Sequence, residues 1–291
     1  MTAVVVRRKR DWLSFGLGSW AVVVYIFLFI PIGFLIGHSF TKSSAFEVWA
    51  GPPTLKWYPK VFDNDQLTNA ITASFKTAFG ATIVATLIGS LAGITMARRK
   101  GRWTKPFLVL VLLVLVTPEI VDAFGLLRWF VSNQLQFNLE GTIFSLREGL
   151  LPLIIGQSLF STAVVILIVR ARMEGLDETL EQAAEDLYAT PRRAFMQITL
   201  PLVSPAVFAA ALLAFTLSLD NTIVSNFVNT PGNSTLPAYV FGKTKSVLGP
   251  DIAAASTMML LVTLVALGLV VVVLKRAGDS SSDIAATITG Q

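Results

Sequence analysis

Six long apolar segments constrain the fold of this chain more than any other feature of its sequence. Each has about 20 residues, the length at which a helix crosses the hydrocarbon core of a bilayer. Hydrophobic residues make up 54% of the chain and charged residues only 14%, whereas a soluble domain usually has about 25% charged residues. The sequence therefore predicts an all-α membrane protein with six transmembrane helices, at about 14–37, 70–97, 106–128, 150–170, 202–227 and 252–274.

The basic residues predict which connections face the cytoplasm. Fifteen of the 23 Lys and Arg flank the first and last segments or fall in the second and fourth connections. Because cytoplasmic connections are enriched in Lys and Arg, we expect that side to be cytoplasmic, with both termini inside. The net charge of +5 then reflects topology and does not indicate nucleic acid as a partner. These residues are Arg7, Arg8, Lys9, Arg10, Arg98, Arg99, Lys100, Arg102, Lys105, Arg170, Arg172, Arg192, Arg193, Lys275 and Arg276.

Three parts are expected along the chain: a cytoplasmic N-terminal segment (1–13), a six-helix domain (14–276) and a small, polar tail (277–291) that we expect to be disordered. The first apolar run, Trp20–Gly37, lacks a small-residue cleavage site and is expected to be a retained span. Small residues four apart, Gly33 with Gly37 and Gly89 with Gly93, predict close helix packing.

Cofactor chemistry has little support in the composition. The chain has one His and no Cys, which excludes disulfides and most transition-metal sites. The stretch Gly242-Lys243-Thr244 resembles the end of a phosphate-binding loop, but Pro237 stands where that motif requires Gly. We therefore expect this chain to bind no nucleotide, metal or other cofactor.

The segment from Met173 to Leu200 is charged and lies between two apolar segments. Its apolar residues recur at helical spacing and its acidic residues occupy the remaining positions, which predicts an amphipathic helix outside the hydrocarbon. Thr190 and Pro191 are typical of an N-cap and a first helical position. We expect a second short helix, Arg192–Thr199, to stop at Pro201, where the fifth span opens. The apolar face is predicted to comprise Met173, Leu176, Leu180, Ala183, Ala184 and Leu187.

The spacing within this segment resembles the EAA loop of binding-protein-dependent ABC importer permeases: E-A-A, three residues, G, nine residues, I-x-L-P. The resemblance implies a type I importer transmembrane domain in the bacterial inner membrane, with both ATP and Mg²⁺ bound by two separate ATPase subunits. A second homologous permease subunit and an extracytoplasmic solute-binding protein are the other implied partners; related families use homodimers. The implied docking loop (173–201) contacts the ATPase through Gln182, Ala183, Ala184, Glu185, Tyr188, Ile198, Leu200 and Pro201.

Two positions depart from that motif. Gln182 stands at the motif Glu, so Glu181 or Glu185 could instead supply a carboxylate to the ATPase. Tyr188 stands at the motif Gly, which eases a bend because Gly tolerates positive φ. The bend could therefore persist at Tyr188 at a cost, or move to Thr190-Pro191.

Further stretches resemble the spermidine/putrescine permease subgroup, which implies a polyamine as the transported solute. The same machinery for a sugar-like, amino-acid-like or anionic solute is the alternative. The stretches are Leu55-Lys56-Trp57-Tyr58, Asn64-Asp65, Thr117-Pro118-Glu119-Ile120-Val121, Phe215–Asp220, Val224–Val228, Leu236-Pro237 and Pro250–Ala254.

Three acidic residues fall within the apolar segments: Glu119, Asp122 and Asp220. Burying a carboxylate is costly, so acids inside a membrane are candidates for function. We expect them, with Asn221, to line a path for a cationic solute. Alternatively, they lie at the outer interface and pair with basic residues there, for which Arg128 and Lys76 are the candidates. A membrane-embedded enzyme using these acids would need a metal or nucleophile set that the sequence does not supply.

Overall fold

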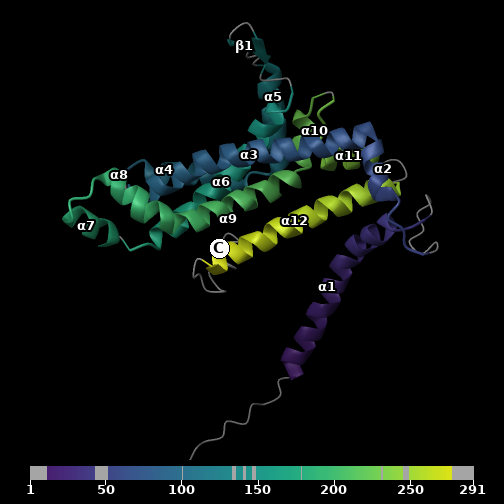
Figure 1. Cartoon of the computed structure of the whole chain (residues 1–291), viewed down its shortest axis with the longest axis horizontal. Coiled ribbons are helices and arrows are strands. Elements are labelled where there is room, and N and C mark those ends of the chain that lie inside the picture. The colour runs from purple at the N-terminus through teal and green to yellow at the C-terminus, as the bar shows by residue number, and fades with distance from the viewer. Residues whose placement is uncertain are drawn as a thin grey trace, which may run out of the picture. The chain divides into compact units, whose positions relative to one another are not determined.

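The part of the chain that the structure describes is almost entirely helical (Figure 1). The computed structural model describes residues 12–42, 52–99, 101–132, 136–139, 142–145, 149–177, 179–230, 232–244 and 249–276. It divides into two compact units, residues 1–61 with 247–257 and residues 62–246 with 258–291. The predicted tail and most of the predicted N-terminal segment lie outside the described residues.

The first unit contains α1 (Trp12–Ser39) and most of α2 (Trp57–Asp63). Residues 18–34 of α1 are exposed and predominantly apolar. Where α1 ends, the chain turns back on itself: the Trp57 indole donates to the Thr41 carbonyl at 2.6 Å, and the Ser39 and Tyr58 hydroxyls lie 3.0 Å apart. Two residues of the Leu55–Tyr58 stretch therefore hold the connection between α1 and α2.

Three helices form the core of the second unit: α3 (Asp65–Arg98), α6 (Leu151–Glu174) and α9 (Leu200–Leu219), which lie side by side. Their contact depends on small residues. A Cβ added to Gly89 would lie 2.7 Å from the Val165 side chain, and one added to Gly93 would lie 2.9 Å from the Ile166 carbonyl. The close packing predicted for this glycine pair is confirmed, while Gly33 has no heavy atom within 4 Å of an added Cβ.

The third predicted span, 106–128, is not a single straight helix. It is divided into α4 (Thr104–Val116) and α5 (Glu119–Ser132), which meet at 102°. Pro118 causes the break because proline disfavours helical geometry at the preceding residue and lacks an N–H; Thr117 is accordingly extended, at φ −62° and ψ 131°. The described residues thus contain five helices long and apolar enough to span a membrane, or six if this bent pair forms one span.

The prediction that a short helix stops at Pro201 is wrong. Helix α8 (Pro191–Ala194) continues through a π-helical turn, η1 (Phe195–Thr199), directly into α9. Proline removes an N–H donor and its ring crowds the preceding turn, and a wider π-helical turn can accommodate this without ending the helix. The Leu200 N–H bonds to the Phe195 carbonyl, five residues back.

Two other predicted boundaries also differ. The predicted amphipathic helix is divided, because α6 ends at Glu174 and α7 (Thr179–Asp186) begins after a turn that includes Gly175. The fifth span ends at Leu219 and not at 227, and a separate helix, α10 (Ile223–Val228), follows.

The remaining elements complete the chain. Helix α11 (Leu236–Lys243) is tied to α3 by the Leu236 N–H, which donates to the Ser74 hydroxyl at 2.8 Å. Helix α12 (Pro250–Arg276) packs on α9 through Val270 and Leu274. Strands β1 (Gln136–Leu139) and β2 (Thr142–Ser145) pair antiparallel, with Gln136 opposite Ser145.

Candidate docking loop and substrate cavity

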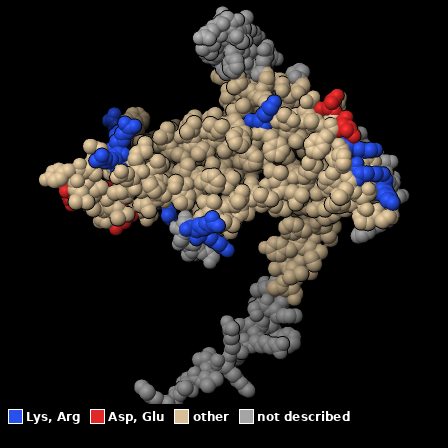
Figure 2. Space-filling view, in the orientation of Figure 1, with Lys and Arg blue, Asp and Glu red and all other residues tan. Residues whose placement is uncertain are grey.

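Helix α7 is a short, charged helix at one end of the core helices. Figure 2 shows acidic side chains beside basic ones over the end that carries α7 and α8, whereas most of the visible surface along the helices has no charged side chains. Asp177 begins the helix by accepting the Thr179 N–H at 2.9 Å, and this bond lowers the pKa of Asp177. Ala184 is the one residue of α7 that is buried.

The exposed residues of the loop include two large side chains at the C-terminal end of α7. Leu187 is 82% exposed and Tyr188 is 95% exposed. Tyr188 has φ +57°, the left-handed conformation in which non-glycine residues are uncommon. The Ala189 N–H bonds back to the Ala184 carbonyl at 2.9 Å, which closes the helix end around Tyr188. Of the two bend positions that the sequence left open, the left-handed turn lies at Tyr188.

Glu181 contacts two other segments of the chain through one carboxylate oxygen. Its Oε1 atom lies 2.8 Å from Arg98 Nη2 at the end of α3. The same oxygen accepts the Thr199 hydroxyl at 2.6 Å from the last residue of the π-helical turn. These contacts engage Oε1 of Glu181, which is partly exposed, whereas Glu185 is exposed and is the more accessible of the two carboxylates.

The other predicted docking residues fall into two groups. Gln182 and Ala183 are exposed on α7, on the same short helix as Glu185. Ile198, Leu200 and Pro201 lie on the continuous helix formed by η1 and α9. The I-x-L-P part of the motif therefore belongs to the helix of the fifth span as well as to the predicted docking loop.

A cavity of about 600 Å³ lies where α9 breaks before α10. Glu119 of α5 lines it together with Asp220 and Asn221, and so do the hydroxyl-bearing residues Thr216 and Thr222. Its other lining residues are Phe160, Leu213, Leu217, Ile223, Thr263 and Leu267. Asp122 is not among the lining residues, so three of the four predicted path residues share one cavity and the fourth does not.

A network of buried and partly buried hydrogen bonds lies beside this cavity. Asn221 donates from its side chain to Glu119 Oε1 at 2.5 Å, and the Ser225 hydroxyl donates to the Asn221 carbonyl at 2.7 Å. Gln157 of α6 donates to Ser225 at 2.8 Å and accepts the hydroxyl of Ser218. The Gln157 amide thus joins the end of α9 to α10 across the break that carries Asp220 and Asn221.

The role of Gln157 was not foreseen from the sequence. The sequence feature that could have indicated this role is the single amide side chain within the apolar run 151–169. A buried amide in a membrane requires hydrogen-bond partners of its own. Ser218 and Ser225 fall within stretches already singled out, but nothing in the sequence indicated that both contact one residue.

The alternative in which the acids form ion pairs finds no support in the described part of the chain. The ion pairs observed there are Arg98–Glu181 and Arg170–Glu174, and neither Arg128 nor Lys76 pairs with Glu119, Asp122 or Asp220. The cavity therefore has two carboxyl groups without a basic partner in the same described region. Nor do the described residues contain a group of three His, Cys, Asp or Glu placed to hold a metal ion.

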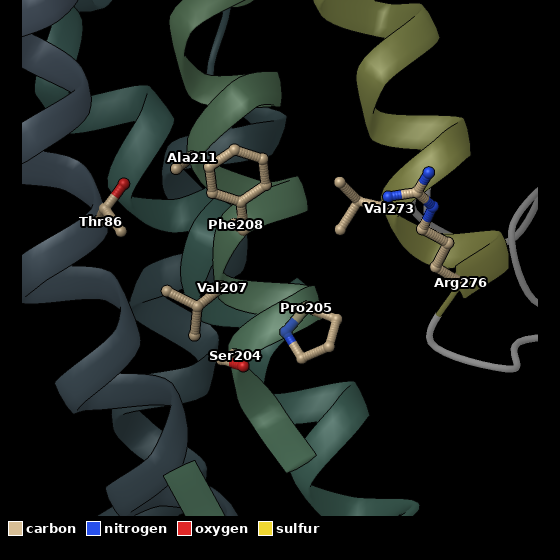
Figure 3. Close-up of a pocket in the computed structure, with 8 residues that line it drawn as sticks. All are labelled: Thr86, Ser204, Pro205, Val207, Phe208, Ala211, Val273 and Arg276. Carbon is tan, nitrogen blue, oxygen red and sulfur yellow. The ribbon is translucent and has the colours of Figure 1, made fainter. Parts of the chain in front are cut away.

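A second cavity, of about 620 Å³, has a different character (Figure 3). Figure 3 shows Pro205, Val207 and Phe208 of α9 and Val273 of α12 around it, with Arg276 at the end of α12. Its remaining lining residues are Thr86, Ser204 and Ala211. With no carboxylate, this apolar space has nothing to attract a cation.

Long apolar helices, a charged loop with a left-handed bend and an acid-lined cavity together define a membrane transport protein. Residues 85–279 match the family model described as "Binding-protein-dependent transport system inner membrane component". The chain therefore belongs to this family of inner-membrane transport components.

Relatives with high similarity carry more specific names. The chain is 33% identical over 246 residues to the putrescine transport system permease protein PotI of Escherichia coli K12, covering 83% of this chain and 85% of that one. It is 34% identical over 249 residues to the spermidine/putrescine transport system permease protein PotC of the same organism, covering 85% and 89%.

Solved structures share the fold at low sequence identity. A chain of a bacterial ABC transporter that imports the acidic polysaccharide alginate superposes with a TM-score of 0.67 at 15% identity, covering 92% of this chain and 96% of that one. A chain of the MetNI methionine ABC transporter superposes with a TM-score of 0.55 at 13% identity, covering 72% and 93%. The predicted transmembrane fold of an ABC importer is thereby confirmed.

Proposed function

We propose that this chain forms half of the translocation path of an ATP-driven importer for a polyamine such as spermidine or putrescine. The observation that carries the substrate class is the cavity lined by Glu119, Asp220 and Asn221. A carboxylate about 4 Å from an ammonium group contributes roughly 4 kcal/mol at an effective dielectric constant near 20. Two such groups offset part of the desolvation that a polyamine undergoes on leaving water.

The names of the two E. coli relatives agree with this substrate class. An anionic solute fits the cavity poorly, because it would meet two carboxyl groups with no ion-pair partner among the described residues. Uptake of labelled putrescine and spermidine by the reconstituted importer tests the assignment, with glutamate and maltose as non-cationic controls. Saturable uptake of a control in place of the polyamines would contradict it.

The end of the chain that carries α7 is proposed to face the cytoplasm. Arg98, Arg170 and Arg172 lie at the ends of α3 and α6 on this side, in accord with the excess of basic residues in cytoplasmic connections. Both termini would then be cytoplasmic and Asp220 would lie toward the outer side.

The ATPase is proposed to be a separate subunit that binds the docking loop. Leu187 and Tyr188 support this assignment because large apolar and aromatic side chains exposed in water are typical of protein contacts. The chain has no Cys, so the single thiol introduced by Tyr188→Cys can carry a photo-activated cross-linker without interference. We expect Tyr188→Cys to cross-link to the ATPase in transport-active membranes.

Gln66→Cys is the matched control for this experiment. Gln66 is also exposed, but it lies near the opposite end of α3 from Arg98, about 50 Å away at the rise of an α-helix. ATPase cross-linking from Gln66→Cys and not from Tyr188→Cys would invert the proposed orientation. Cross-linking from neither variant would remove the support for the docking loop.

A second permease subunit is proposed as the other wall of the path. A charged solute must be kept from lipid along its whole route, and one chain with five or six spans provides one wall. The apolar surface of α1 from 18 to 34 is available for such a subunit. An extracytoplasmic binding protein would deliver the polyamine from outside.

A further inference from the structure

Three segments far apart in the sequence meet at one carboxylate oxygen. Glu181 Oε1, on α7, accepts a hydrogen bond from Arg98 at the end of α3 and from Thr199 at the end of η1, at 2.8 and 2.6 Å. Arg98 and Glu181 have side-chain exposures of 20% and 30%, and Thr199 is buried. This clasp, defined as Arg98, Glu181 and Thr199, is therefore partly shielded from water, where charge-assisted bonds are stronger than on an open surface.

Apolar packing holds α7 only weakly. The helix has eight residues, and Ala184 is its one buried side chain. A helix of this length is not stable alone in water, and a single alanine provides little resistance to sliding or rotation. The directional bonds of Glu181 are what set the orientation of α7 on α3 and η1.

The clasp joins α7 to two of the three core helices. Thr199 is followed without interruption by α9, which extends for 20 residues to the Asp220 position at the cavity, about 30 Å away at the rise of an α-helix. The π-helical turn beside Thr199 is a type of helix irregularity frequently found at functional sites. A displacement of α7 is thus applied directly to α3 and to the base of α9.

We propose that Glu181 is a positioning residue that transmits the movement of the ATPase from α7 to α3 and α9. The inference rests on the proposed docking of the ATPase to this loop. It assigns Glu181 an internal role: the carboxylate holds the loop to the path-forming helices, while the neighbouring exposed residues contact the partner.

The test compares Glu181→Gln with Glu174→Gln in the complete importer, purified through a tag on this chain and reconstituted in liposomes. Both changes remove a carboxylate that lies 2.8 Å from an arginine, but Glu174 is 51% exposed, pairs with Arg170 within α6 and is outside the clasp. For Glu181→Gln we expect normal co-purification of the ATPase and about three- to tenfold less putrescine uptake per ATP hydrolysed, in the range of mutations that perturb coupling between sites. Glu174→Gln should keep its uptake per ATP within about twofold of the unmodified importer.

Two further variants distinguish transmission from general loss of structure. Thr199→Ser keeps the hydroxyl and should keep coupling, whereas Thr199→Val removes it at similar volume and should lower uptake per ATP. The exchanged pair Arg98→Glu/Glu181→Arg should recover part of the coupling lost in either single charge reversal.

The proposal is overturned if Glu181→Gln and Glu174→Gln show the same uptake per ATP. It is also overturned if Glu181→Gln loses the ATPase during purification, because Glu181 would then form the docking surface itself. Failure of the proposed docking function gives a different result: the cross-linker carried by the Tyr188→Cys variant would not reach the ATPase, whatever the coupling ratio of the Glu181 variant.

Discussion

At the scale of single residues, Tyr188 adopts an unfavourable backbone conformation at an exposed position. A left-handed conformation costs an L-residue roughly 1–2 kcal/mol, and Tyr188 adopts φ +57° with its ring almost entirely exposed. With its side chain 95% exposed, Tyr188 has little packing against the described residues to offset this cost. The ring is therefore best explained by a contact outside the chain, in keeping with its proposed place against the ATPase.

We predict that Tyr188→Gly leaves the chain as stable as before or more stable by about 1 kcal/mol, since glycine accepts positive φ without strain. Co-purification of the ATPase should weaken nevertheless, because the exposed ring is lost. Leu187→Gly is the control, since Leu187 is also exposed but is not in the left-handed region. It should lower the thermal unfolding midpoint in detergent, and an equal loss of stability in Tyr188→Gly would contradict the prediction.

Asp220 is the residue on which the cation assignment can be tested most directly. Asp220→Asn should lower polyamine uptake at least about tenfold, because losing a third of an interaction worth roughly 4 kcal/mol changes an equilibrium by that factor. Polyamine affinity of the isolated binding protein should stay unchanged. Asp122→Asn is the matched control, since Asp122 does not line the cavity, and a larger effect of the control would contradict the assignment.

At the scale of elements, helix breaks place the cavity residues. The break at Thr117-Pro118 starts α5 with Glu119, and the break after Leu219 leaves Asp220 and Asn221 between α9 and α10. Breaks within membrane segments are tolerated where protein or a wet cavity satisfies the freed backbone groups. The Thr117 N–H and hydroxyl both bond to the Leu113 carbonyl, at 2.9 and 2.7 Å, which closes the last turn of α4 up to the break.

Pro118→Ala should reduce uptake while leaving the importer assembled. Without the proline, residues 116–119 can become helical, and α5 with Glu119 would move relative to α9. Uptake and co-purification of the ATPase are the measurements. Pro152→Ala is the control because Pro152 lies in the first turn of α6, where a missing N–H costs little. Normal uptake by Pro118→Ala would show that the bend does not place Glu119 for transport.

At the scale of the whole molecule, the predicted docking loop and the cavity lie at opposite ends of α9. The loop joins α9 at Thr199, and the α9 residues that line the cavity are Leu213, Thr216 and Leu217. A movement applied at the proposed docking loop can therefore reach the cavity through one continuous helix.

The importer is expected to need a second, distinct permease chain. Purification of this chain with the ATPase alone should yield a complex that neither transports polyamine nor responds to the binding protein by increased ATP hydrolysis. Addition of the second permease should restore both activities. A fully active transporter made from this chain and the ATPase would show that the path is built from two copies of it.

The sequence by itself determined the class of this protein and the location of its loop. Hydropathy, basic-residue distribution and the register from Gln182 to Pro201 are local properties, and each can be read from neighbouring residues. Asn64 and Pro118 likewise act on adjacent backbone: Asn64 caps α3 by accepting from the Gln66 and Leu67 N–H groups, and Pro118 ends α4.

Only the tertiary structure decided which of these residues act together. Arg98 and Glu181 are 83 positions apart, and Glu119 and Asn221 are 102 apart. No periodicity links residues at such separations, so neither the contacts of Glu181 nor the separation of Asp122 from Asp220 could be inferred. Whether the helix continues across Pro201 also depended on tertiary structure. A π-helical turn and packing against α3 and α6 outweighed the local tendency of proline to end a helix. Local chemistry thus specified the elements, and packing selected the partners of their side chains.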